Sequence, residues 1–156
     1  MNQTRRDFLK AGSGVLICAC AGVGVGAPGC AMMSGTSRMP AVPPEASRGS
    51  DGKLLIDLAR VPALAVVGGS AKWGPAGGDK KMCIVRSGDD RFDAFINRCT
   101  HRGKELEYRH DERRLRCVSF GHSEFDLEGR KLSGPARENL TKLAVTRSGD
   151  ALEIAL

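Results

Sequence analysis

Cysteine and histidine recur in two short stretches of this sequence, Cys99-Thr100-His101 and Cys117-Val118-Ser119-Phe120-Gly121-His122. Each stretch offers one thiolate and one imidazole, which are ligands for zinc and for iron-sulfur clusters. The separation between His101 and Cys117 leaves room for a strand, a turn and a returning strand, which would place the two stretches side by side. The sequence therefore predicts a metal site built from two loops.

The residues around these stretches favour β-structure from Gly52 onward. Short runs rich in Leu, Ile and Val alternate with turn signals such as Ser87-Gly88-Asp89-Asp90 and Ser148-Gly149-Asp150, which supply the tight reversals of hairpins. No helical period is sustained there. We therefore expect an all-β, antiparallel domain over residues 52–156. The expected strands are 53–58, 63–67, 81–85, 92–97, 113–118, 142–145 and 152–156.

The composition narrows the class of protein. The chain of 156 residues has one Trp, one Tyr and five Phe against 27% charged residues, so its apolar core is modest and something besides burial should help to fix the fold. Its six cysteines and three histidines are the candidates.

The net charge of +6 is mild, and no long Lys/Arg run with interleaved aromatics is present. These features argue against nucleic-acid binding.

Residues 1–30 have the pattern of an export signal. Thr4-Arg5-Arg6-Asp7-Phe8-Leu9-Lys10 precedes an uncharged stretch from Ala11 to Gly29, and this resembles the twin-arginine (Tat) signal of bacteria. The stretch is barely long enough to span a bilayer of about 30 Å, which favours a signal segment over a stable membrane helix. Its fate is open between lipidation at Cys30, cleavage near Ala31 and retention as an anchor. The resemblance implies export of a folded, cofactor-containing protein to the periplasm or the outer face of the cytoplasmic membrane.

Two further features of the N-terminal part complete the expected organisation. Cys18 and Cys20 lie inside the signal segment, where we interpret them as small apolar residues. Residues 31–51 show neither a period of 2 nor one of 3.6, which predicts a flexible tether. The chain is therefore expected to consist of a signal or anchor over 1–30, a tether over 31–51 and a β domain over 52–156.

Three motifs in the β domain resemble the Rieske [2Fe-2S] family, in which two cysteines bind one iron and two histidines bind the other. Residues 99–103, Cys-Thr-His-Arg-Gly, resemble the first cluster loop, residues 122–129 the second loop and its hairpin, and residues 133–136 the proline loop. The resemblance covers about residues 52–156 and implies an antiparallel Rieske-like β-sandwich with a cluster-binding loop subdomain and one [2Fe-2S] cluster. The implied ligands are Cys99, His101, Cys117 and His122, surrounded by Ser123, Phe125, Gly134 and Pro135.

The sequence departs from the family pattern at three places. The usual second loop reads Cys-x-x-His-Gly-Ser, whereas His122 follows Cys117 by a longer spacing and directly precedes a serine. Lys104 and Ser119 replace the cysteines that join the loops by a disulfide in many quinol-oxidising members, which resembles the ferredoxin-like branch. Phe125 replaces a Tyr whose hydroxyl bonds a cysteine sulfur in high-potential members, so we expect a potential in the lower or middle part of the family range.

The expected function is one-electron transfer by an exported protein, acting as a carrier or small subunit of an oxidoreductase rather than as an enzyme on its own. Only His110 remains after the ligands are assigned, which does not suffice for the mononuclear iron site of an oxygenase. The expected partner is a redox protein or a larger oxidoreductase subunit, which Arg102, Lys104 and Arg137 would meet with positive charge. A membrane tether through the N-terminal segment or a lipidated Cys30 is also expected.

A structural zinc-binding module is the alternative hypothesis. It would use the same two cysteines and two histidines without redox activity. In a mononuclear zinc site all four side chains converge on one ion, whereas in a binuclear site the cysteines and the histidines bind different irons. Spacing alone does not distinguish these two arrangements.

Overall fold

The computed structural model describes residues 36–74, 78 and 80–156. The expected signal segment, with Cys18, Cys20 and Cys30, lies outside the described residues. The chain divides into two units, and the second, Ser34–Leu156, contains all of the described residues. Among them, no helix has the length and apolar character that crossing a membrane requires.

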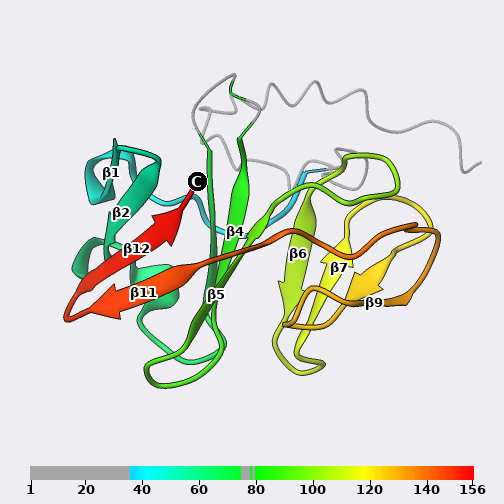
Figure 1. Ribbon diagram of the computed structural model, residues 1–156. Helices are drawn as coiled ribbons and strands as arrows, with labels where there is room; N and C mark the ends of the chain where they lie inside the picture. Colours follow the sequence, from blue (N-terminus) through cyan, green and yellow to red (C-terminus); the bar gives the residue numbers. More distant parts are fainter. Residues whose placement is uncertain (1–35, 75–77, 79) are drawn as a thin grey trace, which may run out of the picture. The chain divides into compact units, whose positions relative to one another are not determined.

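The described residues form three four-stranded antiparallel sheets, ordered β1-β2-β12-β11, β10-β5-β4-β3 and β6-β7-β8-β9 (Figure 1). This confirms the expected all-β fold. Three short 3-10 helices accompany the sheets: η2 Pro44–Ala46, η3 Leu58–Arg60 and η4 Pro62–Leu64. The strands are β1 Ser47–Ser50, β2 Lys53–Asp57, β3 Ser70–Trp73, β4 Met82–Arg86, β5 Phe92–Ile96, β6 Leu106–Arg109, β7 Arg114–Cys117, β8 Glu124–Phe125, β9 Lys131–Ser133, β10 Lys142–Leu143, β11 Val145–Ser148 and β12 Ala151–Ala155.

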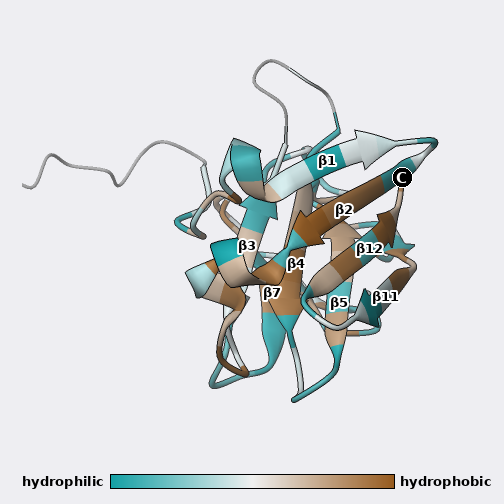
Figure 2. Ribbon diagram, turned by 90° about the vertical axis from the view of Figure 1, so that its left-hand side faces the viewer, coloured by the Kyte–Doolittle hydropathy of each residue, from teal (hydrophilic) through white to brown (hydrophobic). Residues whose placement is uncertain are grey.

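Two separate apolar cores stabilise these sheets. The basal core is formed mainly by the first two sheets, and β2, β4 and β12 carry its apolar bands in Figure 2. The loop core lies against the third sheet and contains both cysteines of the expected site. Val85 of β4 and Phe95 of β5 also belong to the loop core, so the second sheet contributes side chains to both cores. Central members of the loop core are Phe95, Cys99, Leu106, Leu115, Cys117 and Phe125.

The strand expected over residues 63–67 is absent. Pro62 instead begins η4, and the guanidinium of Arg86 donates hydrogen bonds to the carbonyls of Leu64 at 3.3 Å and Ala65 at 2.6 Å. Val66 remains 66% exposed. The apolar residues of this run suggested a strand. A helical turn is favoured instead, because proline suits the first helical position and the Arg86 cation binds the free carbonyls at the end of the turn.

The prediction of a flexible tether is wrong for residues 36–51, which pack against the domain. Met39 belongs to the loop core and Val42 to the basal core. The Val42 N–H donates to the Lys72 carbonyl at 2.8 Å, and β1 pairs with β2 along its whole length. Burial of two apolar side chains and backbone pairing stabilise a segment that has no periodic pattern.

Glu105 fixes the beginning of this segment, residues 36–42, which we call the strap. Its carboxylate accepts a hydrogen bond from the Ser37 N–H at 2.9 Å and forms ion pairs with Lys72 at 3.3 Å and Lys81 at 3.1 Å. Burial alone would raise the pKa of Glu105, but the Ser37 N–H and the two lysines bring it below its ordinary value. The ionised carboxylate therefore stabilises the attachment of the strap.

We expect acid to loosen the strap. A depressed pKa gives a stabilising contribution that is complete above the ordinary value of 4.5 and is lost as pH falls through the lower pKa of the folded state. The measurement is hydrogen exchange at the Val42 amide, corrected for the intrinsic rate. Glu105→Gln should lower this protection at neutral pH by about fivefold, equivalent to about 1 kcal/mol, and abolish its acid dependence. Glu45→Gln, at an exposed position in η2, is the control, and equal protection in both variants would contradict the role of Glu105.

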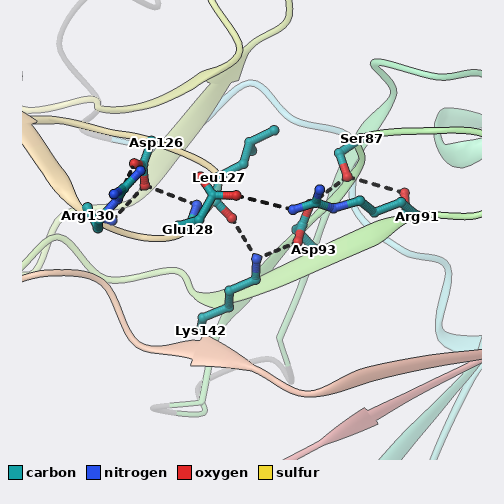
Figure 3. A network of polar contacts seen from close by, with 8 residues as sticks. All are labelled: Ser87, Arg91, Asp93, Asp126, Leu127, Glu128, Arg130 and Lys142. Carbon is teal, nitrogen blue, oxygen red and sulfur yellow. Dashed lines mark hydrogen bonds and ion pairs between the residues drawn. The ribbon is translucent and has the colours of Figure 1, made fainter.

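A buried carboxylate connects β5 with the chain that follows the second ligand stretch (Figure 3). Asp93 in β5 pairs with Lys142 at 2.6 Å, and the same ammonium donates to the Leu127 carbonyl at 2.7 Å. Arg91 bridges Asp93 at 3.4 Å and Glu128 at 3.2 Å. Because the buried Asp93 has two charged partners, Arg91 and Lys142, this network holds residues 126–129 against the second sheet.

Candidate metal centre

The first ligand loop follows β5 and is closed by its own backbone. The Gly103 N–H donates to the Cys99 carbonyl and the Cys99 N–H to the Lys104 carbonyl, both at 2.8 Å. The buried side chain of Asn97 accepts a hydrogen bond from the Leu106 N–H at 2.7 Å. These bonds hold Cys99 at 1% exposure and leave His101 half-buried.

The second ligand loop begins at Cys117, the last residue of β7. The His122 N–H donates to the Ser119 carbonyl at 3.1 Å and closes a four-residue turn. Gly121 has a φ of +102°, which the third position of a type II turn requires. Phe120 occupies the second position and is 97% exposed. The turn thus accommodates the long spacing between Cys117 and His122.

The two ligand loops and the proline loop meet at the same end of the third sheet. The Val118 N–H of the second loop donates to the Glu105 carbonyl at 3.1 Å. The Thr100 hydroxyl of the first loop donates to the Glu138 carbonyl at 2.7 Å. These bonds connect the first loop with both other segments.

The structure brings Cys99 and Cys117 together. Both thiols are free and buried in the loop core. Burial raises the pKa of Cys117; the side chain and backbone N–H of Ser119 lower it, and Cys99 raises it, with a net upward shift. Two adjacent buried thiolates need a cation between them. The pair is therefore suited to binding one metal ion.

The two histidines are placed differently. His101 Nδ1 is buried and has no hydrogen-bond partner, whereas His122 is exposed and its Nδ1 lies 3.3 Å from the Cys117 carbonyl oxygen. A buried ring nitrogen without a partner needs one to be supplied, and a metal ion is such a partner. Within the described ranges, no group of three or more Cys, His, Asp or Glu side chains is gathered around one position.

The proline loop packs closely on the second ligand loop. The hydroxyl of Ser123, which is 1% exposed, accepts a hydrogen bond from the Ala136 N–H at 2.9 Å. Gly134 has a φ of +82°, and a Cβ there would lie 2.5 Å from Ser123 Cα. The ring of Pro135 lies 3.3 Å from the position of a Cβ on Gly121. Phe125 is fully buried in the loop core, which also contains Cys99 and Cys117.

Residues 68–144 match the model of the Rieske [2Fe-2S] domain. The chain contains a Rieske [2Fe-2S] domain. Among solved structures, the cyanobacterial plasma membrane Rieske protein PetC3 from Synechocystis PCC 6803 aligns at 25% identity and a TM-score of 0.49, covering 56% of this chain and 87% of that one. The ferredoxin of carbazole 1,9a-dioxygenase from Nocardioides aromaticivorans IC177 aligns at 19% identity and a TM-score of 0.52, covering 65% and 93%. No curated protein matches the chain.

A Rieske domain binds a [2Fe-2S] cluster, and the donor set of this chain fits one. Two free thiols buried in the same core suit one iron, and the unpartnered Nδ1 of His101 suits the other. One further cysteine and one further histidine of the described residues lie outside the set. Cys83 is fully buried in β4, where burial raises its pKa to about 12, and His110 is exposed beyond β6 with its ring beside Gly68.

Ser119 lies beside the candidate ligand Cys117, and the sequence pattern assigned it no role in the site. Its Oγ lies 3.0 Å from Cys117 Sγ. The available signal was its position two residues after Cys117, where related proteins carry half of a disulfide. The sequence showed the missing disulfide, but the contact between hydroxyl and sulfur required the turn that follows.

A cavity of about 400 Å³ opens beside the first ligand loop of the Rieske domain. Cys99 and His101 line it together with Arg98, Arg102 and Glu138. The arginines give this side of the site a positive rim. Arg102 and Arg98 are also exposed to solvent, so the rim is accessible from outside.

Proposed function

We propose that this chain is an exported one-electron transfer protein whose Rieske cluster is held by Cys99 and Cys117 on one iron and by His101 and His122 on the other. The observation that carries the ligand assignment is the burial, in one core, of two unbridged thiols from separate loops, with Cys99 near enough to raise the pKa of Cys117. The buried and unpartnered Nδ1 of His101 supports the second pair.

The protein surrounds this site with apolar and hydrogen-bonding groups. When bound, the cluster accepts and releases one electron. Phe125 and the other members of the loop core exclude water from the cysteine side, while Ser123 and Gly134 hold the proline loop against the second ligand loop. A site fixed in this way needs little rearrangement when its charge changes, which favours electron transfer.

The end of the domain that carries the three loops is the proposed docking surface for a redox protein or a larger oxidoreductase subunit. Arg102, Lys104 and Arg137 are exposed there, and Phe120 adds a side chain that is 97% exposed. An aromatic anchor surrounded by positive charge fits a partner with an apolar hollow and an acidic rim. The electron would leave the cluster through this end because the ligand loops lie there.

The proposed location is the periplasm or the outer face of the cytoplasmic membrane. The twin arginines Arg5 and Arg6 before an uncharged stretch support export by the Tat route. The same segment, or a lipid on Cys30, would serve as a membrane tether. In this arrangement the strap and the Rieske domain form the exported part.

Fractionation combined with EPR tests the proposal. We expect the full chain, produced in a bacterium with a Tat system, to give the EPR signal of a reduced [2Fe-2S] cluster in the exported fraction after dithionite. The matched control replaces Arg5 and Arg6 together by lysine, which keeps the charge but removes the recognised pair. This variant should retain its cluster and remain in the cytoplasm.

Two results would contradict the proposed function. A colourless, EPR-silent wild-type protein with one zinc ion per chain would identify the structural zinc module and exclude electron transfer. Export would be contradicted if the wild-type protein carried its cluster but stayed in the cytoplasm, as the lysine variant is expected to do. Metal analysis of each fraction separates the two cases.

A further inference from the structure

We infer that the Ser119 hydroxyl donates a hydrogen bond to the sulfur of Cys117 and raises the reduction potential of the Rieske cluster. Ser119 Oγ lies 3.0 Å from Cys117 Sγ. The inference rests on the proposed function only for the assignment of Cys117 as a ligand. It gives a role to a residue that stands where a disulfide cysteine stands in related proteins.

The backbone fixes Ser119 in this position. Its carbonyl accepts the hydrogen bond from His122 that closes the turn, at 3.1 Å, and the N–H of the preceding Val118 is bonded to Glu105 at 3.1 Å. The side chain is partly buried. The hydroxyl is therefore held beside the sulfur by contacts on both sides of the residue, which reduces the entropy lost in forming the bond.

Metal binding decides the direction of this hydrogen bond. In the free thiol either atom can donate. A cysteine that binds iron is a thiolate without a proton, so its sulfur can only accept and the Ser119 hydroxyl must donate. Reduction adds negative charge to the cluster and its sulfurs, which strengthens the bond. A bond that is stronger in the reduced state raises the potential.

The contact between Ser119 and Cys117 changes the expected reduction potential, which Phe125 alone suggested would lie in the lower or middle part of the family range. Phe125 has no hydroxyl to offer a cysteine sulfur. The Ser123 hydroxyl accepts a hydrogen bond from the Ala136 N–H at 2.9 Å, which leaves its proton free to donate elsewhere. Ser119, the first residue of the turn, contacts the Cys117 sulfur, whereas Ser123 and Phe125 follow the turn. The loss of the tyrosine hydroxyl at Phe125 is therefore offset by a hydroxyl from a different position in the sequence.

Redox titration of the purified, cluster-containing protein tests the role of Ser119. We expect Ser119→Ala and Ser119→Val to lower the midpoint potential, so that the ratio of reduced to oxidised cluster at a fixed solution potential falls about tenfold, equivalent to about 59 mV for one electron. Ser119→Thr keeps the hydroxyl and should keep most of the wild-type potential. Because Thr and Val have the same shape, their difference isolates the hydroxyl.

Ser133→Ala is the control for the loss of a serine hydroxyl nearby, because the Ser133 hydroxyl donates to Glu124 at 3.2 Å and not to a sulfur. Its potential should equal that of the wild type. Equal potentials in the Thr and Val variants would overturn the inference. Loss of the cluster from both Ala and Val variants would also overturn it, because the hydroxyl would then serve assembly. Failure of the proposed function would instead appear in the wild type, as a missing cluster signal.

Discussion

Replacing His122 by alanine is expected to remove the cluster from the protein. His122 follows the turn of the second ligand loop with a φ of +41°, and it is one of the two histidines proposed to bind the second iron. Losing one imidazole opens the coordination of that iron to water. Changes in residues that merely support a ligand cost about 10- to 100-fold in metal affinity, so loss of the ligand itself should lower cluster content at least as much. Visible absorption, EPR and iron content per chain measure the effect.

His110→Ala is the matched control for this prediction. His110 is exposed, and its ring lies beside Gly68 rather than at the ligand loops, so the variant should keep its full iron content. A second comparison adds Phe120→His to the His122 variant, which restores the usual Cys-x-x-His spacing. We expect no recovery, because the Phe120 side chain is 97% exposed on the turn whereas His122 Nδ1 lies 3.3 Å from the Cys117 carbonyl oxygen. Full iron content in the His122→Ala protein would show that another residue binds the second iron.

Substitution of Gly134 by alanine is expected to cause a large loss of stability. Gly134 has a φ of +82°, and a Cβ would lie 2.5 Å from Ser123 Cα and 2.9 Å from Ser123 N. These are backbone atoms, so the proline loop must move. The left-handed conformation costs about 1–2 kcal/mol for a residue other than glycine. Displacement of the loop also breaks the hydrogen bond between Ser123 and Ala136, which adds to the cost. We expect a loss of about 2–4 kcal/mol in the free energy of unfolding.

Urea unfolding of the cluster-containing protein measures this loss, with Gly49→Ala as its control. Gly49 lies in β1, and a Cβ there would meet nothing within 4 Å. That variant should remain within about 0.5 kcal/mol of the wild type. Equal stability of the two variants would mean that the proline loop moves away without cost. The contact between Gly134 and Ser123 would then not hold the loop in place.

Local patterns predicted much of the basal sheets but not the smaller strands. The apolar runs that became β2, β4, β5 and β12 were recognised because they alternate or are continuously apolar between turn signals. β1 and β9 were not, since most or all of their side chains are exposed. Such strands are stabilised by pairing with neighbours distant in sequence, and a local pattern contains no record of that pairing.

The donor residues were predictable because few side chains bind iron or zinc as thiolates and imidazoles do. Their types and order in the sequence are visible directly: Cys99, His101, Cys117 and His122. The environment of these donors was not. The contact of Ser119 with Cys117 at 3.0 Å depends on the turn closed by His122. The unpartnered Nδ1 of His101 depends on burial by other loops. Both are properties of side chains brought together from separate segments.

The sequence by itself determined the all-β class, the Rieske resemblance and the identity of the candidate ligands. Only the tertiary structure decided that residues 36–51 belong to the domain, where Met39 enters the loop core and Glu105 holds the strap. It also showed which hydroxyl reaches a cysteine sulfur. The reason is physical: ligand chemistry is fixed by residue type, whereas burial and hydrogen bonding depend on which distant segments meet in the folded chain.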